Sequence, residues 1–235
     1  MMKMTILAPR RQGMTHDQFR TYLIDVHGPL VRSITEVAAE IRHYHYNFPL
    51  PGATDTSFGH PRADLDVITQ GFFDSREAQL ANMRHQRFKE VLRPDESNFA
   101  DTSRALMHYT DEHEVVGGES TSTKVFYLRR RKPGLTREEF QSQWLAEFPR
   151  LLPSLPLNDI ITRYVQNHVQ AEDHHPDGVS DRFYDIIDEF WLSTPTALDT
   201  ISPGIGASAV AGLEAELLDV GRTRAHIATM YPSIP

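Results

Sequence analysis

The chain contains two copies of one sequence pattern, about 120 residues apart. Residues 10–19 are matched by residues 131–140, with Gly13 at the position of Gly134, an offset of 121. The offset then falls in single steps to 118, as small loop deletions between two copies of one fold would produce. The matched pairs are Ile41 and Ile161, Tyr44 and Tyr164, Asn47 and Asn167, Asp66 and Asp185, Phe72 and Trp191, Asp101 and Asp219, and His108 and His226.

Each copy predicts the element order β-α-β-β-α-β. In the first copy, strands are expected at 2–8, 41–48, 65–73 and 104–109, with a second helix from Ser75 to about residue 90. In the second copy, strands are expected at 124–128, 160–169, 184–192 and 222–230, with a helix at 207–218. The first helix of each copy opens with a capping box, Thr15-x-x-Gln18 and Thr136-x-x-Glu139.

This order predicts an α+β fold of two tandem ferredoxin-like (βαββαβ) half-barrels, because helices cover only one face of each sheet. Two such sheets can bury their uncovered faces together, so we expect them to pack as an intrachain α+β barrel. The predicted domains are residues 1–116, the catalytic half, and residues 124–235, a degenerate half. Residues 117–123 form the expected linker, because Gly117-Gly118 and hydroxyl residues follow the last strand.

Charge and composition limit the kinds of molecule that the protein is expected to bind. The formal net charge of −8 repels phosphate backbones and anionic lipid surfaces, so we expect no nucleic acid and no membrane as partner. The chain has no cysteine, which excludes thiolate nucleophiles and cysteine-ligated metals. The first ten residues lack the apolar core of a signal peptide, and the expected location is cytoplasmic.

A collinear set of motifs resembles the EthD-like family. Residues 10–19 fit R-x-x-G-[LM]-[ST]-x-x-x-F, and His27-Gly28-Pro29 follows; Tyr44-x-x-Asn47 and the segment 95–101 match further along. The resemblance implies the dimeric α+β barrel superfamily, and we expect that the chain can form a homodimer. It also implies cofactor-free dehydratases, decarboxylases and cyclases that act on small, often aromatic or polyketide-derived molecules.

His27 is the first candidate catalytic residue. It continues the apolar face of the first helix, and its counterpart in the second copy, at the offset of 121, is Phe148. Gly28-Pro29 is expected to end the helix, and a helix C-terminus favours the protonated imidazole whereas an apolar pocket favours the neutral one. A histidine titrates near pH ~6.5, which suits a general acid/base. The alternative is a core histidine bonded to a backbone carbonyl.

The strand after the first helix supplies more candidates. Alternation places His43 and His45 on one face and Tyr44 and Tyr46 on the other. We expect His43 or His45 to form the opposite member of an acid/base pair with His27. One of these histidines or Tyr44 would polarise or deprotonate a substrate hydroxyl. The alternative is a polar strand face that lines a wet barrel interior.

Asp66 completes the catalytic candidates. A carboxylate in an apolar strand needs a partner, and we expect Asp66 to orient a histidine by fixing its tautomer. Because Asp185 occupies the same place in the second copy, a role in the fold is the alternative. The residues expected to line the substrate site are Phe19, Tyr22, Leu23 and Tyr46.

Two groups of residues have side chains that could bind a metal ion: His27 with His43 and His45, and the acidic, histidine-containing loop 172–177. Pro176 and Gly178 are typical of a solvated loop, and the prediction is that no metal is bound. Fingerprint motifs for nucleotides or flavins are absent from the sequence, so we expect no organic cofactor.

These observations predict a cofactor-independent lyase of aromatic compound catabolism. It would remove water, carbon dioxide or an aldehyde from an aromatic or polycyclic small molecule by histidine acid/base catalysis. An isomerase or cyclase, or a cofactor-free monooxygenase on the same scaffold, is the alternative. A non-catalytic accessory protein that binds small molecules is the alternative from a different class.

Overall fold

A computed structural model describes residues 1–51, 60–155, 159–170, 183–194 and 208–234. It has the predicted α+β character, with antiparallel sheets and helices. The chain forms two compact units. Unit 1 comprises Met1–Phe48, Asp64–Thr110 and Met230–Pro235; unit 2 comprises Pro49–Ala63 and Asp111–Thr229.

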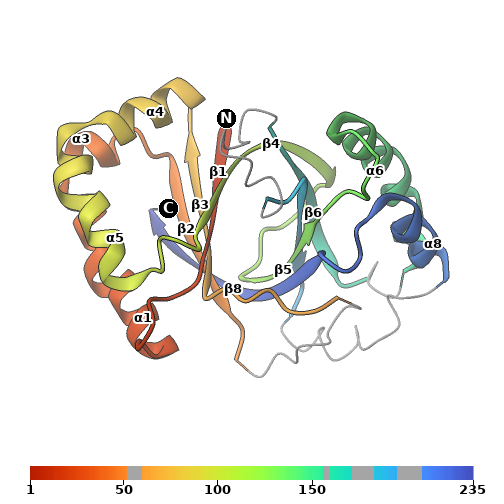
Figure 1. Cartoon of the computed structure of the whole chain (residues 1–235), viewed down its shortest axis with the longest axis horizontal. Coiled ribbons are helices and arrows are strands. Elements are labelled where there is room, and N and C mark those ends of the chain that lie inside the picture. Colours follow the sequence, from red (N-terminus) through yellow and green to blue (C-terminus); the bar gives the residue numbers. More distant parts are fainter. Residues whose placement is uncertain (52–59, 156–158, 171–182, 195–207, 235) are drawn as a thin grey trace. The chain divides into compact units, whose positions relative to one another are not determined.

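Unit 1 is a four-stranded antiparallel sheet in the order β4-β1-β3-β2. In the centre of the sheet, Thr5 lies opposite Gln70 on β3 and His108 on β4. The elements are β1 (Met2–Ala8), α1 (His16–Tyr22), η1 (Leu23–His27), α2 (Gly28–Ser33), α3 (Thr35–Ala38), β2 (His43–Pro49), β3 (Val67–Phe73), α4 (Arg76–Arg84), η3 (Phe88–Leu92), α5 (Arg93–Phe99) and β4 (Leu106–Val116). The helices gather on one face of this sheet (Figure 1).

Two apolar clusters join the helices of unit 1 to that face. In the first, Val31, Ile34 and Val37 pack against Met4 and Phe73 of the sheet. The second holds Phe19, Leu23 and Phe99 from the helices together with Ala8, Tyr46, Phe48 and Val67 from the strands. The second cluster contains most of the residues expected to bind substrate, so this part of the helix-sheet interface positions the candidate site.

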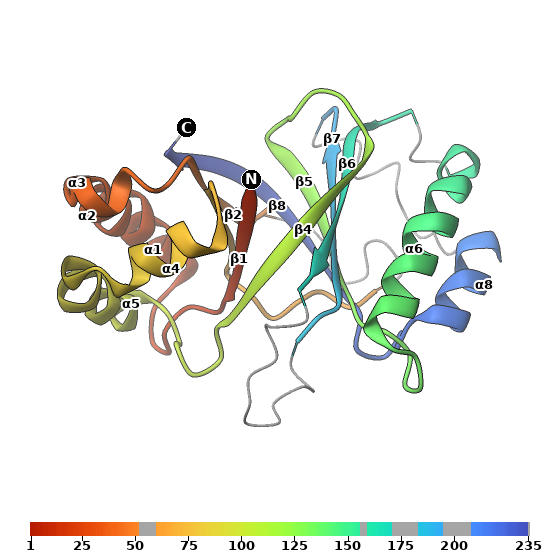
Figure 2. The same cartoon turned by 90° about the horizontal axis from the view of Figure 1, so that it is seen from above.

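Unit 2 repeats the same strand order, β8-β5-β7-β6. Its elements are β5 (Thr123–Arg129), α6 (Arg137–Leu151), η4 (Leu152–Ser154), β6 (Ile161–Val169), β7 (Ile186–Leu192), α8 (Ser208–Leu217) and β8 (Arg224–Ile234). Helices α6 and α8 lie side by side on one face of its sheet (Figure 2). Phe140, Trp144 and Phe148 of α6 are buried there. The packing of the two sheets into one barrel stays a prediction.

The two compact units are not contiguous in sequence, and the domains 1–116 and 124–235 stay a prediction. The segment after β2 belongs to unit 2 because it bonds to β8: the Leu50 amide donates to the Ile227 carbonyl at 2.9 Å, and the Ala63 amide to the Ala225 carbonyl at 2.8 Å. The end of β8, in turn, belongs to unit 1. Each unit therefore includes a short segment of the other sequence copy.

The first helix does not end at Gly28-Pro29, contrary to the prediction. Gly28 is helical (φ −59°, ψ −48°), and α2 continues from it. The residues before it form a π-helical turn in which the Gly28 amide donates to the Leu23 carbonyl. Helix α2 begins directly after this π-helical turn, and its proline lies in the first turn of α2, where a missing amide hydrogen costs little. His27 therefore lies within a continuous helical run.

Both predicted capping boxes are present. The Thr15 and Thr136 side chains accept hydrogen bonds from the amides of Gln18 and Glu139, whose side chains bond back. Among the described residues, none of the helices has the length and apolar content needed to cross a bilayer.

Candidate active site

A buried histidine-carboxylate pair forms the centre of the candidate site. His27 ends η1 and is 6% exposed, and its Nδ1 lies 2.8 Å from Oδ2 of Asp95 in the first turn of α5. The His27 ring also packs on Phe99, with ring centroids 4.7 Å apart. Because Nδ1 is engaged by the carboxylate, Nε2 is the nitrogen left for chemistry.

Asp95 is itself held in place. The Tyr22 hydroxyl donates to its Oδ1 at 2.6 Å, and the Asn98 amide group donates to the same oxygen at 3.1 Å. The carboxylate thus bonds His27 through one oxygen and two neutral donors through the other. Such a set fixes both the ring orientation and the tautomer of a histidine.

Burial and hydrogen bonding set the protonation of the pair. Burial lowers the pKa of the His27 imidazole below its usual range, although the bond to Asp95 and its charge partly oppose this. Burial would raise the pKa of Asp95, but the hydrogen bonds that it accepts from its neighbours outweigh burial and lower this pKa. Burial, followed by the bond to Asp95, raises the pKa of Tyr22. At neutral pH the site therefore holds a neutral imidazole next to a carboxylate.

The second copy lacks both members of the pair. Each copy has an isolated strand bridge just after its last helix, Arg10 with Ala100 and Arg131 with Leu218. Because Arg10 and Arg131 are equivalent, Ala100 and Leu218 are equivalent too, which gives an offset of 118 for this part of the chain. At that offset Leu213 takes the place of Asp95, while Phe148 takes the place of His27. Phe148 is 3% exposed and stacks on Trp144 at 4.7 Å, so an apolar plug fills the equivalent position.

His43 and His45 do not join His27, which corrects the predicted acid/base pair. Their rings lie 5.9 and 5.5 Å from Phe72, on the face of the sheet away from the helices. Tyr44 and Tyr46 alternate with them and pack toward the helices. For the same reason, His27, His43 and His45 do not come together as a metal site.

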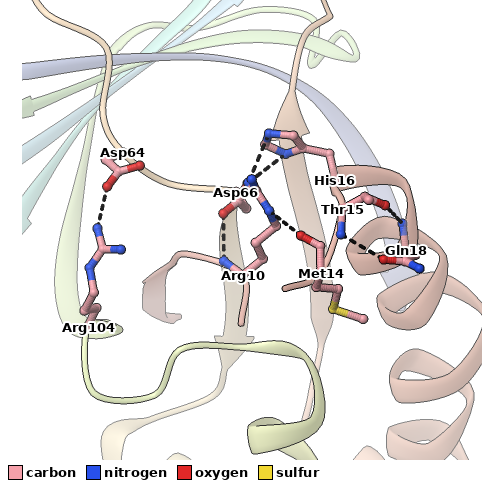
Figure 3. A network of polar contacts seen from close by, with 8 residues as sticks. All are labelled: Arg10, Met14, Thr15, His16, Gln18, Asp64, Asp66 and Arg104. Carbon is pink, nitrogen blue, oxygen red and sulfur yellow. Dashed lines mark hydrogen bonds and ion pairs between the residues drawn. The ribbon is translucent and has the colours of Figure 1, made fainter. Parts of the chain in front are cut away.

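Asp66 belongs to another network, at the start of β3 (Figure 3). It accepts the Arg10 backbone amide at 2.7 Å and pairs with the Arg10 guanidinium, and the exposed His16 ring lies 2.7 Å from its Oδ1. The carboxylate that holds His27 is Asp95, not Asp66. In the second copy, Asp185 accepts the Arg131 amide at 2.9 Å and pairs with its guanidinium. This duplicated contact supports the alternative role in the fold.

The four residues expected to bind substrate lie on the helix side of the unit 1 sheet. Phe19, Leu23 and Tyr46 are 2% exposed or less, and Tyr22 is half-buried. Tyr44 joins them; its burial, and then its neighbours Tyr46 and Glu96, raise the pKa of its phenol well above the usual range. These phenols stay protonated at neutral pH and can donate hydrogen bonds. Their contact with a substrate stays a prediction.

Asp95 is the residue that sequence reasoning missed. It lies in the segment 95–101 that carries part of the family resemblance, but no motif in that segment marks it as catalytic. The comparison of the two copies contained the signal, because an offset of 118 pairs this buried carboxylate with a leucine. The described residues hold no group of three or more histidine, aspartate or glutamate side chains arranged for a metal ion. The loop 172–177 lies outside the described residues.

Known proteins share the first copy. The EthD domain model matches residues 11–103. The conidial pigment biosynthesis dehydratase EthD of Metarhizium robertsii is 34% identical over 110 residues, which cover 44% of this chain and 77% of that protein. Dehydratase ustZ of Ustilaginoidea virens is 29% identical over 110 residues, covering 44% and 78%. A decarboxylase of Claviceps purpurea is 27% identical over 110 residues, covering 44% and 77%.

Solved structures match the fold over the whole chain at low identity. An anthrone oxidase-like protein has a TM-score of 0.59 at 10% identity, covering 100% of this chain and 93% of that one. A putative chlorite dismutase has a TM-score of 0.57 at 12% identity, covering 99% and 95%. The family match includes both His27 and Asp95. The chain belongs to the EthD family, and it is an enzyme.

Proposed function

We propose that the protein is a cofactor-independent lyase that removes water from an aromatic or polycyclic small molecule. The observation that carries this proposal is the buried His27 with Nδ1 bonded to Asp95 and Nε2 left as a base. Relatives that share this part of the sequence are named dehydratases, which supports the loss of water.

The proposed reaction is an elimination next to a carbonyl group. His27 Nε2 takes a proton from the carbon beside the carbonyl, and the electron pair moves onto the carbonyl oxygen. The enolate then re-forms the carbonyl, a carbon-carbon double bond forms, and hydroxide leaves from the adjacent carbon. The imidazolium returns its proton to the leaving oxygen, so water departs and His27 is neutral again. The Asp95 carboxylate stabilises the transient imidazolium.

Decarboxylation is the second candidate, because two of the similar proteins are named decarboxylases. That reaction needs an acid that protonates a ring carbon as carbon dioxide leaves. Burial lowers the pKa of His27, which keeps most of it neutral at pH 7. A neutral imidazole acts first as a base, so this feature favours dehydration. The isomerase, cyclase and monooxygenase alternatives stay predictions, as does a non-catalytic binding role.

We also infer that each half of the sequence forms a ferredoxin-like βαββαβ fold. The support is the strand order, fourth-first-third-second in both units, with helices following the first and third strands. In this arrangement, one sheet face carries the helices and His27.

Turnover of a panel of hydroxylated, polyketide-derived aromatic compounds would test the function. Product masses distinguish the loss of water from the loss of carbon dioxide. His27→Gln should lower turnover about 10²- to 10⁴-fold, the usual contribution of a general acid/base. His43→Gln, on the opposite sheet face, should keep turnover near that of the unchanged protein. Normal turnover of His27→Gln together with loss in His43→Gln would move the site to that face.

A further inference from the structure

Arg32 lies one turn beyond His27 in the same helical run and is attached to the end of β8. Its Nη1 donates to the Ser233 carbonyl at 2.8 Å and to the Ser233 hydroxyl at 3.1 Å. Ser233 is buried, whereas Arg32 is exposed. Ser233 therefore fixes one nitrogen of the guanidinium, while the Arg32 side chain still faces solvent.

Gly28 is the residue that lets this strand end approach. A Cβ atom at Gly28 would lie 2.8 Å from the Ser233 hydroxyl oxygen and 3.4 Å from Arg32 Nη1. The first of these distances is shorter than the contacts that Cβ atoms make in proteins, so a Cβ here would force the Ser233 side chain to move. The glycine that directly follows His27 thus makes room for the contact between Ser233 and Arg32.

The Tyr46 phenol lies next to this pair. It is fully buried, and its hydroxyl makes no hydrogen bond of normal length and angle within the described part of the chain, although the Ser233 hydroxyl lies close to it. Burial raises the pKa of Tyr46, and the Ser233 hydroxyl and the Arg32 charge partly offset the rise. Tyr46 also lies near the His27 pair, because it packs in one cluster with Phe99, whose ring contacts the His27 ring. A buried hydroxyl without a well-formed hydrogen bond is costly, and a bound oxygen that accepts from it would remove this cost.

We propose that Arg32, fixed by Ser233, and the Tyr46 hydroxyl form a binding site for an anionic substrate oxygen, a phenolate or an enolate. This proposal rests on the proposed function, in which removal of a proton by His27 places negative charge on oxygen. Arg32 supplies a permanent positive charge, and Tyr46 supplies a hydrogen-bond donor. Ser233 is a positioning residue, since it acts through Arg32.

The second copy agrees with this assignment. It has Gln166 at the position of Tyr46, besides Phe148 and Leu213 at those of His27 and Asp95. The acid/base pair and the proposed oxygen donor therefore occur together in the first copy and are replaced together in the second. Residues that only build the fold, such as Asn47 and Asn167, are retained in both.

Binding of 4-nitrophenol tests the site without any turnover, because its phenolate absorbs visible light. The unchanged protein should prefer the phenolate, so the pKa of the bound phenol should fall below that in water. Arg32→Gln should weaken phenolate binding about 10- to 100-fold, as expected for loss of a charged hydrogen bond. Tyr46→Phe and Ser233→Ala should each weaken it by a smaller factor and raise the pKa of the bound phenol. Arg32→Lys, which keeps the charge, should retain part of the affinity.

Two controls separate this site from the proposed function. Arg42→Gln removes an exposed arginine that pairs with Asp74 and should leave phenolate binding unchanged. His27→Gln should lower turnover about 10²- to 10⁴-fold yet still bind the phenolate, so a failure of the lyase assay does not affect the binding result. The proposal would be overturned by a folded Arg32→Gln variant with unchanged phenolate affinity. Failure of the unchanged protein to bind the phenolate would overturn it as well.

Discussion

The His27 imidazole and the Asp95 carboxylate meet at 2.8 Å although they lie 68 residues apart in the chain. One comes from the π-helical turn after α1 and the other from α5. In the second copy the same two positions hold Phe148 and Leu213, both packed in an apolar core. The two polar residues are thus present together or replaced together, as expected for a pair that acts as a unit.

Loss of the Asp95 charge should make His27 a less effective base, although the imidazole itself remains. In Asp95→Asn, turnover should fall about 10²-fold or more, because the tautomer and the imidazolium lose their carboxylate partner. The pKa of His27 should also fall further, since the Asp95 charge raises it. Nuclear magnetic resonance titration of the His27 ring measures this change. Asp25→Asn, which alters an exposed carboxylate on the same helical run, is the matched control. An unchanged His27 titration in Asp95→Asn would rule out the coupling.

The pH dependence of kcat/KM should show an acidic limb below pH ~6.5, the ordinary histidine pKa. Neutral His27 is the base, and burial lowers its pKa, so activity is present at neutral pH and is lost as the pH falls through that lowered value. In Asp95→Asn the limb should move to still lower pH. A limb above pH 7 would contradict a neutral, buried base. The measurement is a pH-rate profile at limiting substrate concentration.

Asp66 and Asp185 should behave alike, because each accepts an arginine amide and pairs with the same arginine. Asp66→Asn and Asp185→Asn should each lower the free energy of unfolding by about 1–3 kcal/mol, since a mostly buried ionic contact is lost. Turnover per folded molecule should stay near normal in both. Urea unfolding and activity assays on the same preparations would check this. Lost turnover in Asp66→Asn alone would assign that residue to catalysis.

His168 should make the fold sensitive to acid. Burial, and then the neighbouring His113, lower the pKa of His168 to about 3, and the two rings lie 4.2 Å apart. Above pH ~6.5 the residue is neutral in both the folded and the unfolded states. Below that pH the unfolded state binds a proton that the folded state resists, so the free energy of unfolding should decrease by up to about 4 kcal/mol toward pH 3.

The matched variant is His168→Phe, because the first copy has Phe48 at this position. Urea unfolding between pH 7 and pH 4 should show a flatter dependence than in the unchanged protein. The variant also loses the bond from His168 to Gln166, so its stability at pH 7 is compared separately. An identical pH dependence in the two proteins would refute the assignment.

Gly28→Ala should destabilise the protein although alanine is the better helix former by about 1 kcal/mol. Its Cβ would meet the Ser233 hydroxyl at 2.8 Å and the Leu23 carbonyl at 3.0 Å, and we expect a net loss of about 1–2 kcal/mol. Adding Ser233→Ala should recover part of this loss. Gly212→Ala in α8, where no atom lies within 4 Å of the new Cβ, should stabilise instead. Thermal unfolding of the three variants and the unchanged protein provides the comparison, and a stabilising Gly28→Ala would contradict the close approach.

The sequence was informative wherever one local pattern decided the outcome. Aromatic and β-branched content predicted strands, and the capping boxes predicted the starts of α1 and α6. The repeat predicted the same order of elements in both copies, and the two units have the same strand order. It also singled out His27, because a polar residue in only one of two copies is not required by the fold.

Tertiary structure decided which groups meet. Alternation separates His43 from Tyr44 but does not say which face the helices cover, and that choice removed His43 and His45 from the neighbourhood of His27. The partner of His27 comes from a helix 68 residues away, and Ser233 comes from the end of the second copy. Local patterns record the hydrogen bonds and burial of neighbouring residues only. Contacts between distant segments depend on how all elements pack together, so they become visible only in the folded chain.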